Sequence, residues 1–138
     1  MTFHTFYEGI YDAVKAAVET VSSLNQVVCG ERFVLQETPC AIINPGEVAI
    51  DQQDAGPGLY CGISIEVVLI VRENEPDDWF DEVVEVLGDI LDAVIADRGL
   101  GGLVLDIAPV RFSPAEIRIQ NRLYSGGVVT FMALAVYE

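Results

Sequence analysis

The sequence predicts an α+β fold in which two amphipathic α-helices pack against a mainly antiparallel β-sheet. Two segments, one at the start and one in the middle of the chain, place apolar residues along one helical face. Most other segments are short runs of alternating apolar and polar residues, separated by Gly, Pro and Asn, as is typical of antiparallel strands. With 138 residues the chain can bury a substantial core, so we expect residues 1–138 to form one domain.

A first helix is predicted over residues 3–24. Its apolar residues follow the i, i+3, i+4, i+7 spacing of one helix face. They are Phe3, Phe6, Tyr7, Ile10, Val14, Ala17, Val18 and Val21. We expect the helix to end near the pair Ser22-Ser23.

Short strands joined by tight turns are predicted between Asn25 and Pro57. The strongest turn signal there is Asn44-Pro45-Gly46. A long strand is then predicted over residues 59–72. Five of its apolar residues alternate onto one face: Ile63, Ile65, Val67, Leu69 and Val71. The opposite face is polar at first and apolar later, so we expect helices over one side and only partial exposure to water on the other.

The second helix is predicted over residues 77–97. Pro76 suits the first helical position, and Asp77 and Asp78 complement the positive end of the helix dipole. Arg98-Gly99 is a typical C-terminal signal. The apolar stripe consists of Trp79, Phe80, Val83, Val84, Leu87, Ile90, Leu91, Val94 and Ile95, with acidic residues on the opposite side.

The rest of the chain is predicted to be extended. Residues 103–112 read as a strand in which Pro109 marks an edge or a bulge. Ile117 and Ile119 alternate with polar residues as a half-buried strand. A Ser125-Gly126-Gly127 turn should follow. Residues 128–137 are apolar on both faces, which predicts an interior strand or one that pairs with a neighbouring subunit.

Charge divides the chain into two parts. Residues 1–98 hold four basic and 19 acidic side chains and carry the whole net charge of −15, whereas residues 99–138 are neutral overall. The acidity argues against affinity-driven binding of nucleic acid, which needs basic side chains to displace counterions. The neutral part holds Arg111, Arg118 and Arg122. Arginine pairs well with carboxylates of an identical neighbour, so we predict these three residues at a subunit interface.

The sequence offers little that supports catalysis. We find no nucleophile motif, metal-ligand spacing or phosphate-binding loop, and expect no catalytic, cofactor-binding or metal-binding residues. His4, the single histidine, is expected at the surface, and the three cysteines are expected to be buried, reduced thiols. The Gly99–Gly102 cluster follows a helix and leads into a strand, which indicates a connector.

The expected location of the protein in the cell follows from its apolar segments and its N-terminal segment. The longest uninterrupted apolar run, residues 67–71, is far too short to span a membrane. The N-terminus has no basic region followed by an apolar core, so we expect no signal peptide and a soluble, cytoplasmic protein.

The order of elements and the closing segment Leu123–Glu138, LYSGGVVTFMALAVYE, resemble the tail-terminator proteins of long-tailed phages and related archaeal viruses. These are also called tail-completion or minor tail protein U-like proteins. The likeness extends over nearly the whole chain, through its layout: a long N-terminal helix, short strands around PCAIINPG, a long strand, an acidic helix and strands to the end.

The resemblance implies a structural virion protein without catalytic residues. Such proteins assemble in the host cytoplasm into a hexameric ring that caps the tail tube, stops its polymerisation and joins the tail to the head connector. The partners of this chain would then be copies of itself, the tail tube protein and the connector or neck protein. Viral DNA would pass through the ring without specific binding, and an acidic channel would favour that passage.

Two other interpretations remain open. One is a head-completion or neck protein of the adjoining ring. The other is a small cytoplasmic ligand-binding or enzymatic α+β domain that uses the acidic helix start at Asp77 and Asp78.

Overall fold

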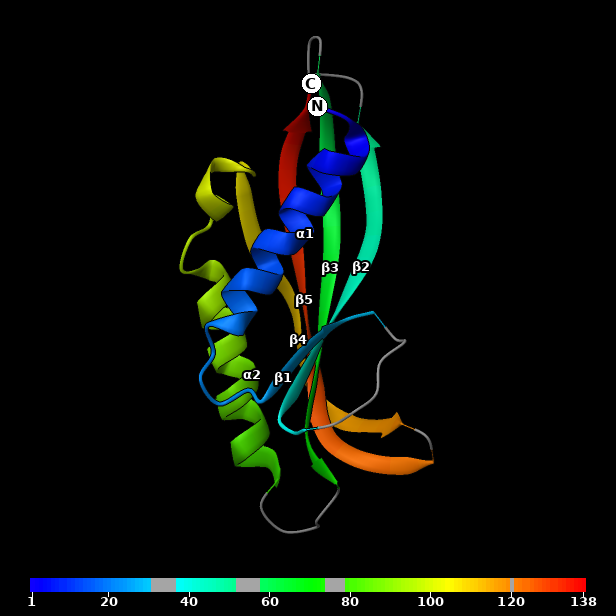
Figure 1. The fold of residues 1–138 in the computed structure, drawn as a ribbon, viewed down its shortest axis with the longest axis vertical. Helices are drawn as coiled ribbons and strands as arrows, with labels where there is room; N and C mark the ends of the chain where they lie inside the picture. The colour runs from blue at the N-terminus through cyan, green and yellow to red at the C-terminus, as the bar shows by residue number, and fades with distance from the viewer. Residues whose placement is uncertain (31–36, 52–57, 74–78, 120) are drawn as a thin grey trace.

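The computed structural model describes residues 1–30, 37–51, 58–73, 79–119 and 121–138, and these form the α+β fold that the sequence predicts. Two helices lie against one face of a five-stranded sheet of order β1-β2-β3-β5-β4 (Figure 1). Strands β1 and β2 run parallel, and the other three pairs are antiparallel. The elements are α1 (Phe3–Glu19), β1 (Gln26–Cys29), β2 (Cys40–Asp51), β3 (Leu59–Glu73), α2 (Trp79–Ile95), the 3-10 turn η1 (Leu100–Gly102), β4 (Asp106–Ile119) and β5 (Arg122–Tyr137).

Helix α1 begins after Thr2, whose hydroxyl accepts a hydrogen bond from the N–H of Thr5 at 3.2 Å, as an N-cap does. The helix ends at Glu19, before the predicted end at Ser22-Ser23. It stops there because the N–H of Thr20 bonds to the carbonyl three residues earlier and tightens the last turn. The buried face of α1 consists of Phe6, Ile10, Val14 and Val18.

Helix α2 confirms most of the predicted apolar stripe. The fully buried members are Val83, Leu87, Ile90 and Val94. Phe80 is 56% exposed, so its predicted place in the buried stripe is wrong. The predicted start of the helix, with Pro76, Asp77 and Asp78, lies outside the described residues.

Strand β2 is continuous over 12 residues, so the predicted turn at Asn44-Pro45-Gly46 is wrong. The pairing of β2 with β3 shifts register between Pro45 and Val48, which is a β-bulge. A Cβ atom on Gly46 would lie 2.1 Å from the carbonyl oxygen of Ser64 in β3. The glycine therefore permits a close approach of two backbones inside the sheet and does not reverse the chain.

The predicted Ser125-Gly126-Gly127 turn is wrong as well, because these residues lie inside β5. The chain reverses instead at Asn121, which has a φ of 65°. A Cβ atom on Gly126 would lie 1.9 Å from the carbonyl oxygen of Leu69 in β3. Figure 1 shows the β4–β5 hairpin bending away from the sheet towards this reversal. Glycine is needed where the bending strand passes so close to its neighbour.

Strand β4 lies at an outer edge of the sheet, and its register with β5 shifts between Pro109 and Arg111. The predicted edge or bulge at Pro109 is therefore confirmed. The two predicted extended pieces form one strand. The prediction of an interior position for residues 128–137 is confirmed, because β5 lies between β3 and β4.

Two hydrophobic cores lie on opposite faces of the sheet. The main core lies under the helices and contains all five alternating residues of β3 that were predicted to share a face: Ile63, Ile65, Val67, Leu69 and Val71. The smaller core is centred on Cys40, Ile42 and Ile70. Ile117, Ile119 and Tyr124 pack against it, so the bent hairpin covers part of the second face.

Candidate interaction surfaces

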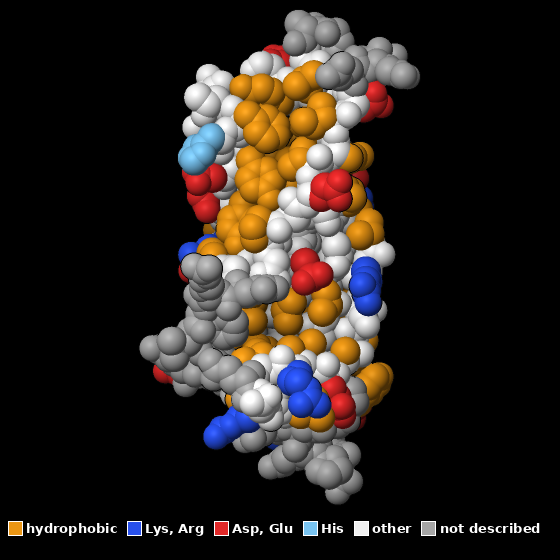
Figure 2. All heavy atoms as spheres, turned by 90° about the vertical axis from the view of Figure 1, so that its right-hand side faces the viewer, with side chains coloured by type: hydrophobic (Ala, Val, Ile, Leu, Met, Phe, Trp, Pro, Cys, Tyr) orange, Lys and Arg blue, Asp and Glu red, His pale blue; other side chains and the backbone are white. Residues whose placement is uncertain are grey.

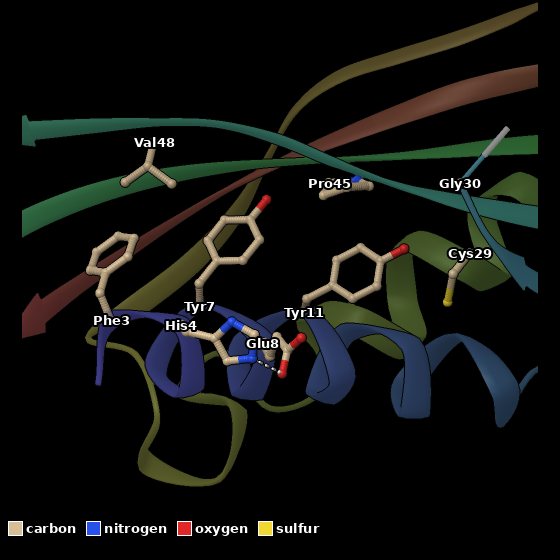
Figure 3. A pocket seen from close by; sticks show the side chains of 9 residues that line it. All are labelled: Phe3, His4, Tyr7, Glu8, Tyr11, Cys29, Gly30, Pro45 and Val48. Carbon is tan, nitrogen blue, oxygen red and sulfur yellow. Dashed lines mark ion pairs between the residues drawn. The ribbon is translucent and has the colours of Figure 1, made fainter. Parts of the chain in front are cut away.

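A groove of 620 Å³ lies between α1 and the outer side of β2. We call it the aromatic groove. Its lining residues are Phe3, His4, Tyr7, Glu8, Tyr11, Cys29, Gly30, Pro45 and Val48 (Figure 3). Figure 2 views the molecule from the right-hand side of Figure 1, and in it hydrophobic side chains gather in a band beside the histidine. The surface is exposed and mainly apolar, as is typical of interaction sites.

Two tyrosines attach α1 to β2 at the floor of the groove. The hydroxyl of Tyr7 donates to the carbonyl oxygen of Gly46 at 3.0 Å, and the hydroxyl of Tyr11 donates to that of Ile43. Burial raises the pKa of both tyrosines. Each ring has its polar end occupied and presents its apolar face, so the groove is preformed and offers apolar contact.

The charged groups that line the groove neutralise each other when His4 is protonated. His4 Nε2 lies 3.1 Å from Glu8 Oε2, one helical turn away on α1. The two side chains are 76% and 60% exposed, which confirms the predicted surface position of His4. The pair therefore lies at the rim and leaves the apolar floor accessible.

A second apolar surface lies near the β4 edge of the sheet, away from β2, where η1 leads into β4. Leu103, Leu105 and Leu134 are 46%, 66% and 51% exposed, and we call them the leucine patch. The N–H of Leu105 donates to the carbonyl oxygen of Leu134 at 2.7 Å, which joins the loop to β5. Because the three leucines are exposed and this hydrogen bond holds the loop against β5, the leucine patch is a second candidate interaction surface.

Polar contacts hold the loop beneath the leucine patch. The carboxylate of Asp97 accepts hydrogen bonds from the N–H groups of Gly99 and Gly101 at 3.2 and 2.8 Å. Arg98 donates through Nε and Nη2 to both carboxylate oxygens of Asp106 at 2.7 and 2.8 Å. Such a bidentate contact fixes the orientation of the two side chains as well as their distance. The prediction that Gly99–Gly102 is a connector agrees with this geometry.

Replacing Asp106 with asparagine is expected to destabilise the fold at neutral pH and to matter less in acid. Arg98 lowers the pKa of Asp106 below its ordinary value of 3.8, so the folded chain favours the charged carboxylate. That contribution is present above the ordinary pKa and is lost as the pH falls through the lower folded value. Urea unfolding of both proteins at about pH 7 and about pH 3 measures it. A stability difference that does not change with pH would contradict the assignment.

The three predicted interface arginines are exposed but do not form one cluster. Arg111 is opposite Thr130 in the middle of the hairpin, whereas Arg118 and Arg122 lie near its end. Paired residues share a face and neighbours alternate, so the register places Arg118 on the face opposite to the other two. Their role in subunit contacts stays a prediction.

Two of the three cysteines are buried as predicted, and Cys29 is exposed. Cys40 and Cys61 are buried, and burial raises the pKa of the Cys40 thiol to about 11. Cys29 is exposed, at the end of the outer strand β1, where it lines the aromatic groove. The alternative site at Asp77 and Asp78 lies outside the described residues.

The sequence prediction missed the aromatic groove. A local signal was present, because Phe3, Tyr7 and Tyr11 recur every four residues and form a stripe beside the buried face of α1. No local signal could show that the outer side of β2 lies opposite this stripe.

No protein-family model matches the chain, and no curated protein matches it. Within the described residues, no helix is long and apolar enough to cross a membrane. The same residues contain no group of three or more His, Cys, Asp or Glu side chains that could hold a metal ion.

Proposed function

We propose that this chain is a structural subunit that assembles side by side into a ring, and that the ring is a viral tail terminator. The observation that carries the proposal is the pair of different apolar surfaces on opposite sides of one sheet, the aromatic groove and the leucine patch. Contacts between unlike surfaces join identical subunits head to tail, and they close into a ring when the rotation allows it.

The terminator role is supported by the resemblance in layout and in the closing segment. A tail terminator has to bind copies of itself, the end of the tail tube and the head connector, and it needs no catalytic group. A chain whose surface carries apolar patches and many acidic side chains suits this task.

The acidity of the chain suits passage of DNA. The outward face of α2 exposes Glu85, Asp89 and Asp92, and the whole chain carries −15. A ring of such subunits would repel phosphate groups and release the DNA that moves through it. The virion neck is thus the proposed location of the ring.

The proposal predicts self-association that increases with salt. Each subunit carries −15, and added salt screens the repulsion between copies, since the Debye length falls from about 10 Å at 0.1 M to about 3 Å at 1 M. Light scattering coupled to size-exclusion chromatography at these two salt concentrations gives the mass. We expect one oligomer whose mass is a whole multiple of the 15.0 kDa chain, and a larger fraction of the protein in that oligomer at high salt. A strict monomer in both conditions that also fails to bind tail-tube ends would overturn the proposal.

Single substitutions of Arg111, Arg118 and Arg122 by glutamine extend this measurement to the predicted arginine contacts. If an arginine pairs with a carboxylate of the neighbour, its loss weakens association most at low salt. An arginine whose replacement leaves the mass distribution unchanged at both salt concentrations does not contribute to the interface.

A further inference from the structure

We propose that the leucine patch of one copy docks into the aromatic groove of the neighbouring copy. This inference rests on the proposed ring-forming function and states which two surfaces meet. Each copy presents both surfaces, so one type of contact, repeated, would build the whole assembly.

The positions of the two surfaces fit a side-by-side contact. Across the sheet, Ala49 is opposite Gly62, Gly62 is opposite Leu134, and Leu134 is opposite Asp106. This row runs from Ala49, next to the groove residue Val48, to Asp106, next to Leu105, about 14 Å across at the usual strand spacing. In Figure 1, η1 lies on the upper left and β2 on the right, at similar heights. The two surfaces therefore lie towards opposite edges of the sheet, at a similar level of the molecule.

Charge favours a second copy as the occupant of the groove. Residues 99–105, which carry two of the three leucines, form an uncharged run in a chain of net charge −15. The groove has an apolar floor, and its one acidic side chain, Glu8, lies at the rim, where Oε2 is 3.1 Å from His4 Nε2. Two strongly acidic copies can approach most closely where both surfaces are mainly apolar and carry few acidic side chains.

Both surfaces are also preformed. Tyr7 and Tyr11 are held by hydrogen bonds to the backbone of β2, and the loop under the leucine patch is held by Asp97 and by the Arg98–Asp106 pair. Binding between ordered surfaces loses little conformational entropy, so a contact of modest area can be stable.

Cross-linking to the native Cys29 tests this contact in the full chain. Cys29 is exposed and lines the groove, whereas Cys40 and Cys61 are buried. In a Leu105→Cys variant, mild oxidation or a short bismaleimide is expected to join the introduced thiol to Cys29 of the next copy. Because each copy then has one thiol on each side, the product is a ladder of multimers on a denaturing, non-reducing gel.

A Leu105→Cys variant that also carries Cys29→Ser is the matched control. It has one accessible thiol and can form at most dimers. If the single variant also stops at dimers while wild-type protein forms a ring by light scattering, the docking proposal is wrong and the ring-forming function stands. If no ladder forms and the wild-type protein is a monomer at every salt concentration, both are wrong.

A charge placed in the leucine patch provides an independent test. A Leu105→Asp variant would bring an unpaired carboxylate into the apolar groove, and we expect its association constant to fall by about tenfold or more. A Val110→Asp variant is the control, because Val110 is 60% exposed on β4 but outside the leucine patch. Loss of association in the Val110 variant alone would overturn the proposal and place the contact further along β4.

Discussion

Replacing Gly126 with alanine is expected to lower the free energy of unfolding by about 3 kcal/mol, as overpacking at a rigid site does. The added Cβ atom would lie 1.9 Å from the carbonyl oxygen of Leu69 and 3.0 Å from its carbonyl carbon. Both are backbone atoms of β3, so no rotation of a side chain can relieve the clash. The two strands would have to separate where the β4–β5 hairpin bends and where Ser125 is buried. Urea unfolding at constant pH and salt measures the loss.

A Gly88→Ala variant is the matched control for this measurement. Gly88 lies inside α2, and a Cβ atom there would meet no heavy atom within 4 Å. Alanine is the better helix former, so this variant is expected to gain about 0.5–1 kcal/mol. If both alanine variants were as stable as wild type or more so, β3 and β5 would not be as closely packed at Gly126 as described.

Replacing Phe131 with alanine is expected to cost about 3–5 kcal/mol, the usual range for a large aromatic side chain removed from a core. Phe131 is fully buried in the interior strand β5, where it lies opposite Ile65 of β3 and Pro109 of β4. It belongs to the main core beneath the helices. The cavity would lie between elements that the rest of the sheet holds in place, so it would not collapse fully. Denaturant unfolding followed by circular dichroism gives the value.

Leu134→Ala, in the same strand, separates stability from assembly. Leu134 is 51% exposed on the other face of β5, so its loss is expected to change stability by only about 0.5 kcal/mol. It belongs to the leucine patch, however, and the variant should associate more weakly than wild type. The Phe131 variant should show the reverse order of effects under conditions in which it remains folded. Equal stability losses in the two variants would contradict the assignment of Phe131 to the core and Leu134 to the surface.

Periodicity predicted the elements that lie at the boundary between core and solvent. Helix α2 and strand β3 were recognised because one side of each is buried by many neighbours, and burial on one side selects apolar residues at a regular spacing. Glycine was harder to interpret, because the same residue serves a turn and a close approach of two strands. Gly46 and Gly126 were both predicted in turns, and both lie inside strands.

The candidate surfaces were largely beyond local prediction. The aromatic groove exists because the stripe of Phe3, Tyr7 and Tyr11 on α1 lies opposite β2, and the sequence around α1 contains no information about that strand. The exposure of Leu105 likewise follows from the position of its loop at the side of the sheet. An apolar residue beside a strand would ordinarily be assigned to the core. Exposure of Arg118 could be predicted, because it alternates with Ile117 and Ile119, which pack against the smaller core.

The two prolines of the outer strand β4 affect how the protein behaves at high concentration. Pro109 and Pro114 have no N–H group, so a foreign strand aligned along β4 would find two positions without a donor. The bulge beside Pro109 also breaks the regular spacing that a long fibril needs. In the proposed ring, copies of the chain lie close together, and exposed strand edges could then stack into amyloid-like sheets. These prolines would oppose continued backbone hydrogen bonding along β4, so that contacts between copies in the proposed ring would form through side chains.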